Sequence, residues 1–241
     1  MDETVIDNEV VSDSESIICE RIHENTLEEK ALLRLDEGSL EYINLKHRFF
    51  LCLGSLAERC SVVVIRRMVP CSSAMSRAQV MAFKLFEKAV AEKNGGDPNV
   101  KLGWYGTSAD GILRILRSGF DYGALPIGEF RHGLCIYGDC SVANCILQCA
   151  TDANGLKHLV LCRVILGKTE QVLPGSTQCG PSSDQFDSGV DCNQQPKKYI
   201  VWNSDIKTRV LPLYFLSIKL HPISQGSLFS SMMRSYCNCG T

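Results

Sequence analysis

Short runs of apolar residues, many of them β-branched, recur along the chain. Such runs are typical of buried β-strands, because branched side chains pack well on a pleated surface. The clearest is His158 to Leu166, with the sequence HLVLCRVIL. Strands are also predicted at Ser61 to Met68, Val100 to Trp104, Tyr199 to Trp202 and Leu213 to Leu220, and a shorter apolar run covers Leu134 to Tyr137.

Apolar residues at helical spacing predict helices between the strands. Ser76 with Gln79 three residues later is a capping-box pattern, and Gly95-Gly96 should end this helix. Its predicted buried face consists of Ala82, Leu85, Phe86, Ala89 and Val90. Helices are also expected at Glu24 to Leu35 and Cys140 to Ala150, and Leu45 to Leu56 is predicted as a helix or an irregular segment packed on the body.

The stretch from Gly103 to Phe120, GWYGTSADGILRILRSGF, predicts a strand, a glycine turn and a short amphipathic helix. Gly106 is expected at the turn, where it can take backbone angles that other residues avoid. Ser108 can cap the helix, and Asp110 in the first turn suits the helix dipole. Backbone N–H and C=O groups around Gly106 could therefore face a small planar ligand.

The predicted strands concentrate towards the end of the chain and do not alternate regularly with helices. This arrangement favours an α+β fold over a doubly wound sheet. The segment from Gly175 to Pro196 is rich in Gly, Ser, Asp and Pro, and it is predicted as a long loop. No G-x-G-x-x-G or G-x-x-x-x-G-K motif is present, so the common phosphate-binding loops are absent.

The net charge of −2 conceals an acidic N-terminal arm. Through Glu41 the chain holds 13 Asp and Glu against 3 Lys and Arg, whereas the rest holds 14 acids against 22 bases. One interpretation of the arm is a solvated, partly disordered tail. Another is an interaction tail, or a mimic of an acidic ligand.

The 13 cysteines indicate reduced thiols more than a disulfide framework, because their number is odd and the acidic start MDETVIDNEV does not resemble a secretion signal. No metal site is expected, since Cys135, Cys140, Cys145 and Cys149 lack CxxC spacing and interleaved histidines. No apolar run is long enough to predict a membrane span.

Three segments, taken in order, resemble the catalytic domain of poly(ADP-ribose) polymerases (PARPs). The first is Leu102 to Ser108, similar to a strand that ends in His-Gly-Thr/Ser. The second is Gly133 to Tyr137, similar to Gly-x-Gly-Ile-Tyr, and Ser141 to Ala143 follows it. The third is Lys198 to Asn203, similar to Glu-Tyr-Ile-Val-Tyr. The resemblance implies a PARP/ADP-ribosyltransferase-like α+β fold, with mixed, mostly antiparallel β-sheets flanked by short helices.

Three short sequence segments resemble those of one plant subgroup, the SRO (SIMILAR TO RCD-ONE) family. They are WYGTS, FDSGVD at Phe186 to Asp191, and PKKYIVWN at Pro196 to Asn203. The resemblance implies a variable N-terminal region, a PARP-like domain and a C-terminal RST domain that binds transcription factors. We therefore expect an acidic, partly disordered arm at 1–45, a PARP-like domain at 46–220 and a tail at 221–241 without a recognisable RST domain.

The resemblance also assigns roles to four positions. In active relatives a His, a Tyr and a Glu form the catalytic triad, and the Gly after the His pairs its backbone with the nicotinamide carboxamide. The positions that match the triad here are Tyr105, Tyr137 and Lys198, and the glycine is retained as Gly106. By resemblance, the NAD or nicotinamide pocket would contain Gly106, Thr107, Tyr137 and Ser141.

Several of these residues have a plainer interpretation. In this interpretation Trp104 and Trp202 are core aromatics, His158 is an ordinary strand residue, and Lys197-Lys198 is a solvated pair. Tyr105 would either fill a vacated pocket or contact a ligand. His132, next to the second segment, could act as a surrogate polar group.

Loss of the triad His and Glu predicts an inactive ADP-ribosyltransferase, because a cation at Lys198 opposes the positive charge that develops as nicotinamide leaves. The resemblance implies a protein-interaction regulator of stress and development in the nucleus. Its partners would be proteins, with transcription factors in doubt without the RST domain, and the +8 body lacks a recognisable nucleic-acid module. The alternatives are a weak NAD-dependent mono-ADP-ribosyltransferase and a module that binds NAD or ADP-ribose without turnover. No cofactor is required, and NAD is the candidate by resemblance.

Overall fold

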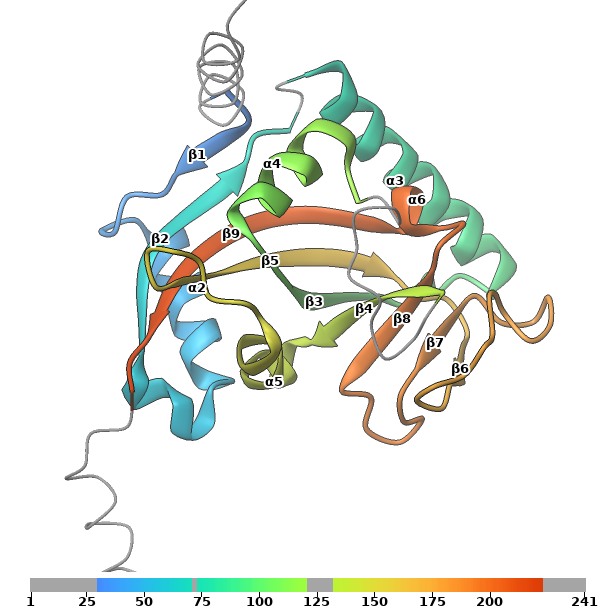
Figure 1. Cartoon of the computed structure of the whole chain (residues 1–241). Coiled ribbons are helices and arrows are strands. Elements are labelled where there is room, and N and C mark those ends of the chain that lie inside the picture. The colour runs from blue at the N-terminus through green and yellow to red at the C-terminus, as the bar shows by residue number, and fades with distance from the viewer. Residues whose placement is uncertain (1–29, 71–72, 121–131, 223–241) are drawn as a thin grey trace, which may run out of the picture.

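The computed structural model describes residues 30–70, 73–120 and 132–222, and one nine-stranded sheet runs through them (Figure 1). The strands lie in the order β1-β2-β9-β5-β3-β4-β8-β7-β6. Neighbouring strands pair antiparallel, except that β6 and β7 pair parallel. The predicted α+β class and the mostly antiparallel pairing are therefore confirmed.

The strands are β1 (Leu32–Arg34), β2 (Cys60–Met68), β3 (Val100–Thr107), β4 (Gly133–Gly138), β5 (Leu156–Ile165), β6 (Thr169–Gln171), β7 (Ser188–Val190), β8 (Lys198–Trp202) and β9 (Val210–Leu220). The helices are α2 (Leu40–Leu51), α3 (Ala74–Lys93), α4 (Ala109–Ser118), α5 (Val142–Gln148) and α6 (Ile206–Arg209). Short 3-10 helices cover η1 (Gly54–Arg59) and η3 (Asp139–Ser141). None of the helices in the described ranges is long and apolar enough to cross a membrane.

The sheet narrows to a short junction between β3 and β4. Eight residue pairs join β3 to β5, but only Gly103–Gly138 and Trp104–Tyr137 join β3 to β4. Beyond Trp104, the last three residues of β3 run free of β4. The site described below lies at this divergence.

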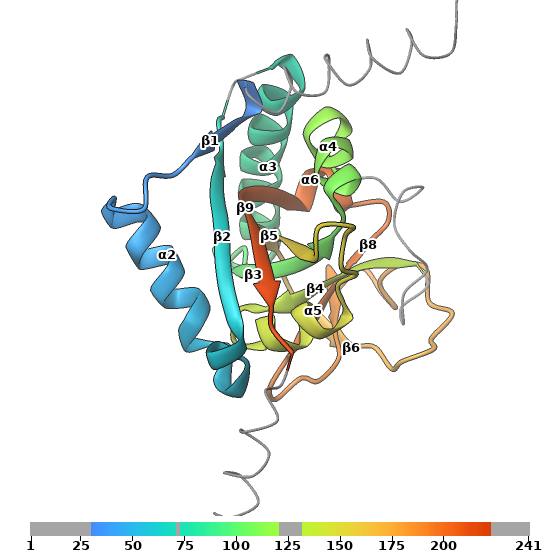
Figure 2. The ribbon, with the colours of Figure 1, turned by 60° about the vertical axis from the view of Figure 1, so that its left-hand side comes forward.

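Apolar side chains fill both sides of the sheet. Figure 2 shows α2 on one side of β2, and α3 with α4 on the other. One core cluster joins α4 to the sheet through residues such as Ile115 and Phe215. A second joins α2 and α5 to the sheet through Phe49, Trp104 and Leu216. Trp104 and Trp202 are both buried, as expected for core aromatics.

The structure corrects the predicted start and buried face of α3. The helix begins at Ala74, and the capping box is formed by Ser73 with Ser76. Phe83 and Val90 are buried against the sheet, whereas Leu85 is 65% exposed and Ala89 is also exposed. The apolar arc of this helix is wider than the face that the sheet covers, so the helical pattern alone did not define the buried side.

Near the start of the predicted PARP-like domain, pairing between distant strands decides the structure, and it differs from the local predictions. The helix expected over Glu24 to Leu35 is wrong at its end, because Leu32–Arg34 pair with β2; its first residues, 24–29, lie outside the described ranges. The boundary at residue 45 cuts through α2, which Ser39 caps by accepting from the Tyr42 N–H.

Two other predictions are corrected, and the tail is mostly undescribed. The loop expected over Gly175 to Pro196 contains β7, which pairs with both β6 and β8. Helix α3 has 20 residues, so not all flanking helices are short. Of the predicted tail, His221 bonds its N–H to the Arg59 carbonyl, and 223–241 lie outside the described ranges.

Candidate functional site

Gly106 lies within β3, and the predicted glycine turn at this position is wrong. It pairs with Leu159 of β5, and it is not among the glycines with positive φ. A Cβ on Gly106 would lie 3.0 Å from the Cβ of Cys149 and 3.5 Å from the Sγ of Cys145. Glycine is therefore needed here because α5 and the residue that follows it pack closely on the backbone of β3.

Two thiols occupy the free edge of β3 at this point. The Cys145 thiol packs against the backbone of Gly106, and burial raises its pKa well above the usual value. The Cys149 thiol lies 3.4 Å from the Thr107 carbonyl and 3.3 Å from the His158 carbonyl, and its single S–H can donate to either of them. Burial also raises the pKa of Cys149. Neutral thiols thus pack against the Gly106 backbone, which the resemblance assigns to the nicotinamide carboxamide.

Tyr137 and Lys198 lie opposite each other on β4 and β8. The Tyr137 ring is buried, its hydroxyl donates to the Gln148 side chain, and the Lys198 Nζ lies 5.7 Å from the ring centroid. A cation at this distance is attracted to the face of an aromatic ring. The position that carries a carboxylate in active relatives therefore holds a cation close to the tyrosine.

Tyr105 packs on the other core cluster. Its ring meets Phe120 edge-on, with centroids 5.4 Å apart and an interplanar angle of 82°. Burial is the main cause of the raised pKa of Tyr105, so the phenol stays neutral. Tyr105 packs against one core cluster and Tyr137 belongs to the other. The structure supports the interpretation that Tyr105 fills space in the core.

The remaining predicted pocket residues lie around this edge. Thr107 ends β3 directly before the α4 cap, where Ser108 accepts from the Gly111 N–H at 3.0 Å as predicted. Ser141 ends η3 and makes no side-chain capping bond to α5. His132 precedes β4 at the end that pairs with Trp202, five residues and roughly 17 Å along the strand from Tyr137. It is therefore too far from Tyr137 to act as a surrogate polar group beside it.

The residues at this site do not fit NAD as active relatives hold it. A thiol packs against the Gly106 backbone, the Tyr137 ring lies beside a cation, and Tyr105 packs in the core. Within the described ranges, no group of three or more His, Cys, Asp or Glu could hold a metal ion.

Comparison with known proteins now identifies the family. No protein-family model matches the chain. It is 36% identical over 222 residues to the Arabidopsis thaliana protein named probable inactive poly [ADP-ribose] polymerase SRO5, a match that covers 90% of this chain and 70% of the relative. The chain belongs to the SRO family. It is also 38% identical over 194 residues to SRO2 of the same plant, another probable inactive polymerase by name.

Coverage and fold agree with this assignment. The SRO2 match covers 78% of this chain and 60% of the relative, so the chain spans less than two thirds of that protein. Among solved structures, the PARP domain of Arabidopsis RADICAL-INDUCED CELL DEATH1 superposes with a TM-score of 0.65 at 25% identity. This match covers 78% of the chain and all of that domain. The PARP-like fold predicted from the three segments is confirmed.

The segment FDSGVD is one of the three that resemble the SRO family. Its Asp187 has a structural role. This carboxylate is 2% exposed and accepts from Lys93 at 2.8 Å, from Asn94 at 2.8 Å and from the Lys168 N–H at 3.0 Å. Arg209 lies 3.5 Å away. Asp187 thereby joins the end of α3, the β5–β6 turn and α6, a role that the sequence alone did not indicate.

The stability of this SRO fold should fall at acid pH through Asp187. Burial alone would raise its pKa, but hydrogen bonds from Lys93, Asn94 and the Lys168 backbone outweigh it and lower the pKa. A carboxylate with a lowered folded-state pKa stabilises above the unfolded value, about 3.9, and loses this contribution as the pH falls through the folded value. Urea midpoints measured between pH 7 and 2.5 should therefore fall more steeply for the wild type than for Asp187→Asn. Parallel curves would contradict this expectation.

A second polar network was also missed from sequence. His158 bonds through Nδ1 to the Ser217 hydroxyl at 3.0 Å and through Nε2 to the Asp152 carboxylate at 2.9 Å. This order resembles a hydrolase triad, but Ser217 is only 4% exposed and cannot meet a substrate. The network instead ties β9, β5 and the loop before β5 together. His158 is therefore a structural link between three segments.

Proposed function

We propose that this SRO chain is a catalytically inactive PARP-like module that works through protein–protein interaction, in nuclear stress and developmental regulation. The observation that carries the proposal is Lys198, a cation 5.7 Å from the centroid of the Tyr137 ring at the position that matches the catalytic glutamate of active relatives. Its partners would be proteins, and no cofactor would be needed.

The chemistry of ADP-ribosyl transfer explains why Lys198 is decisive. Positive charge develops on the ribose as nicotinamide leaves, and a nearby carboxylate stabilises it. In other enzymes, removal of one group that stabilises developing charge costs about 10²- to 10³-fold in rate. A lysine at this position also adds repulsion, because it places like charge near the reacting centre. Tyr105, packed on Phe120, does not supply the polar contact of the lost histidine.

Incubation of the full chain with labelled NAD tests the proposal. We expect no transfer of label to the protein above that of a heat-killed sample. Automodification that disappears in Tyr137→Ala would overturn it. Circular dichroism of that variant should accompany the assay, because Tyr137 is buried and its loss could unfold the chain.

Retention of Gly106 and Tyr137 favours one second candidate, a module that binds NAD or ADP-ribose without turnover. Calorimetry with each ligand at millimolar concentration distinguishes it from the first. Because Cys145 and Cys149 pack closely against the Gly106 backbone, we expect no measurable heat. Saturable heat with either ligand, without transfer of label, would support the binding module.

A further inference from the structure

Helix α3 carries an apolar stripe that the described fold leaves uncovered. The stripe consists of Ala78, Met81, Ala82, Leu85 and Ala89, which recur every three or four residues and so lie along one side of the helix. Met81 is 70% exposed and Leu85 is 65% exposed. Single exposed apolar residues are ordinary, but a contiguous row of them is typical of an interaction surface.

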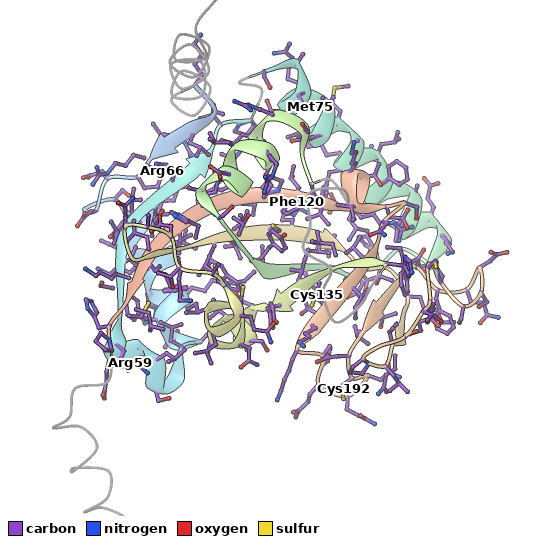
Figure 3. The ribbon with its side chains drawn as sticks, in the orientation of Figure 1. Arg59, Arg66, Met75, Phe120, Cys135 and Cys192 are labelled. Carbon is purple, nitrogen blue, oxygen red and sulfur yellow. The ribbon has the colours of Figure 1, made fainter. Side chains whose placement is uncertain are left out.

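A small pocket continues the stripe towards the sheet. Its volume is about 190 Å³, and its walls come from the first turns of α3, from Phe120 after α4 and from Pro212 on β9. Figure 3 shows Met75, a further wall residue, at the start of α3. The volume is comparable to that of one large apolar side chain. The pocket could therefore hold one such side chain from a segment that lies along the stripe.

Gln79, on the wall of this pocket, has an unsatisfied side-chain amide. Its Oε1 and Nε2 atoms are both buried and have no hydrogen-bond partner among the residues that the structure describes. A buried polar group without a partner costs about 1–3 kcal/mol. A peptide backbone carries one donor and one acceptor, so it would satisfy both atoms if the Gln79 side chain turned into the pocket on docking.

Two lysines lie next to the stripe, and their positive charge favours an occupant that carries negative charge. Lys84 and Lys88 are exposed and lie one turn apart on α3. No carboxylate in the described part of the chain pairs with either of them. An occupant that covers the stripe should therefore carry acidic residues beside its apolar ones.

The first 29 residues of this chain have that composition. They hold ten Asp and Glu against one Arg, and apolar pairs recur among the acids, as in Val5-Ile6, Val10-Val11 and Ile17-Ile18. They also join the fold beside α3. The Ala31 carbonyl accepts from the Val69 N–H at 2.8 Å, and α3 begins five residues later at Ala74. A tethered segment acts at an effective concentration of about millimolar, so even weak contacts would be occupied.

We propose that residues 1–29 dock in cis on the α3 stripe. An apolar side chain of this segment enters the pocket, its backbone pairs with Gln79, and its carboxylates face Lys84 and Lys88. The docked segment covers the stripe against other proteins. The proposal is independent of whether the chain binds or consumes NAD.

Hydrogen exchange and methionine oxidation of the full chain test the docking. Two variants should release the segment: Val10→Ser with Val11→Ser, and Lys84→Glu with Lys88→Glu. Each should raise the oxidation rate at Met81 and the exchange rate of the α3 stripe by about three- to tenfold. Leu147→Glu on α5, where Leu147 is 60% exposed, is the matched control and should change neither rate.

Two results would overturn the proposal. The first is equal protection of α3 in the wild type and in both variants. The second is protection that rises with protein concentration, which would assign the stripe to contact between two copies of the chain. The substitutions lie at exposed positions of α3 or in the N-terminal segment, and an unchanged urea midpoint would show that the fold is intact.

Discussion

Replacing Asp187 by Ala should lower the free energy of unfolding by about 3–5 kcal/mol, the range found when one member of a buried ion pair is removed. The side chain is buried, and Lys93, Asn94 and Arg209 all converge on it. Its loss would leave the Arg209 guanidinium, which is mostly buried, without this carboxylate. Since domains are typically stable by only about 5–15 kcal/mol, the change is a large share of the total.

Urea denaturation followed by circular dichroism measures the effect. The control is Asp184→Ala, three residues earlier in the same segment, where the side chain is exposed. We expect its midpoint to stay within the error of the wild type, because exposed substitutions usually change stability by less than about 0.5 kcal/mol. Similar midpoints for Asp187→Ala and Asp184→Ala would contradict the role of Asp187 as a link between α3, α6 and the β5–β6 turn.

Local signals in the sequence predicted those elements whose formation depends on neighbouring residues. The β5 strand followed from a continuous apolar run, and the α4 cap followed from Ser108 ahead of an amphipathic stretch. Elements formed by distant partners were not predictable in this way. Leu27, Ala31 and Leu35 have helical spacing in the sequence, yet Leu32–Arg34 form a strand because they pair with the end of β2.

In the candidate site, too, the sequence predicted the local motifs but not the contacts between distant segments. Alignment to family motifs found Tyr105, Gly106, Tyr137 and Lys198, and the structure pairs Lys198 with Tyr137 across β4 and β8. It did not indicate that α5 would bring the Cys145 thiol to the Gly106 backbone. A glycine needed for close packing and a glycine needed for a turn look alike in a sequence. Only the position of the packed helix separates the two explanations.

The second large effect is expected at Gly103, in the two-pair junction between β3 and β4. A Cβ at this position would lie 2.5 Å from the Cγ2 of Ile136 and 3.0 Å from the carbonyl oxygen of Tyr137. Gly103 pairs with Gly138 on one side and Cys162 on the other, so its backbone cannot move away without breaking a strand pairing. Gly103→Ala should therefore lower the free energy of unfolding by about 1–3 kcal/mol, the usual cost of overpacking.

The matched control for this substitution is Gly180→Ala. A Cβ on Gly180 meets nothing within 4 Å, and Gly180 is not among the glycines with positive φ. Its stability should be unchanged or slightly raised, because Ala restricts the unfolded chain more than Gly does. Because Trp104–Tyr137 is one of the two residue pairs of this junction, Gly103→Ala should also change the near-UV signal of the tyrosines. Equal urea midpoints for the two alanine variants would show that β4 can shift freely, and the junction would then not hold the site in place.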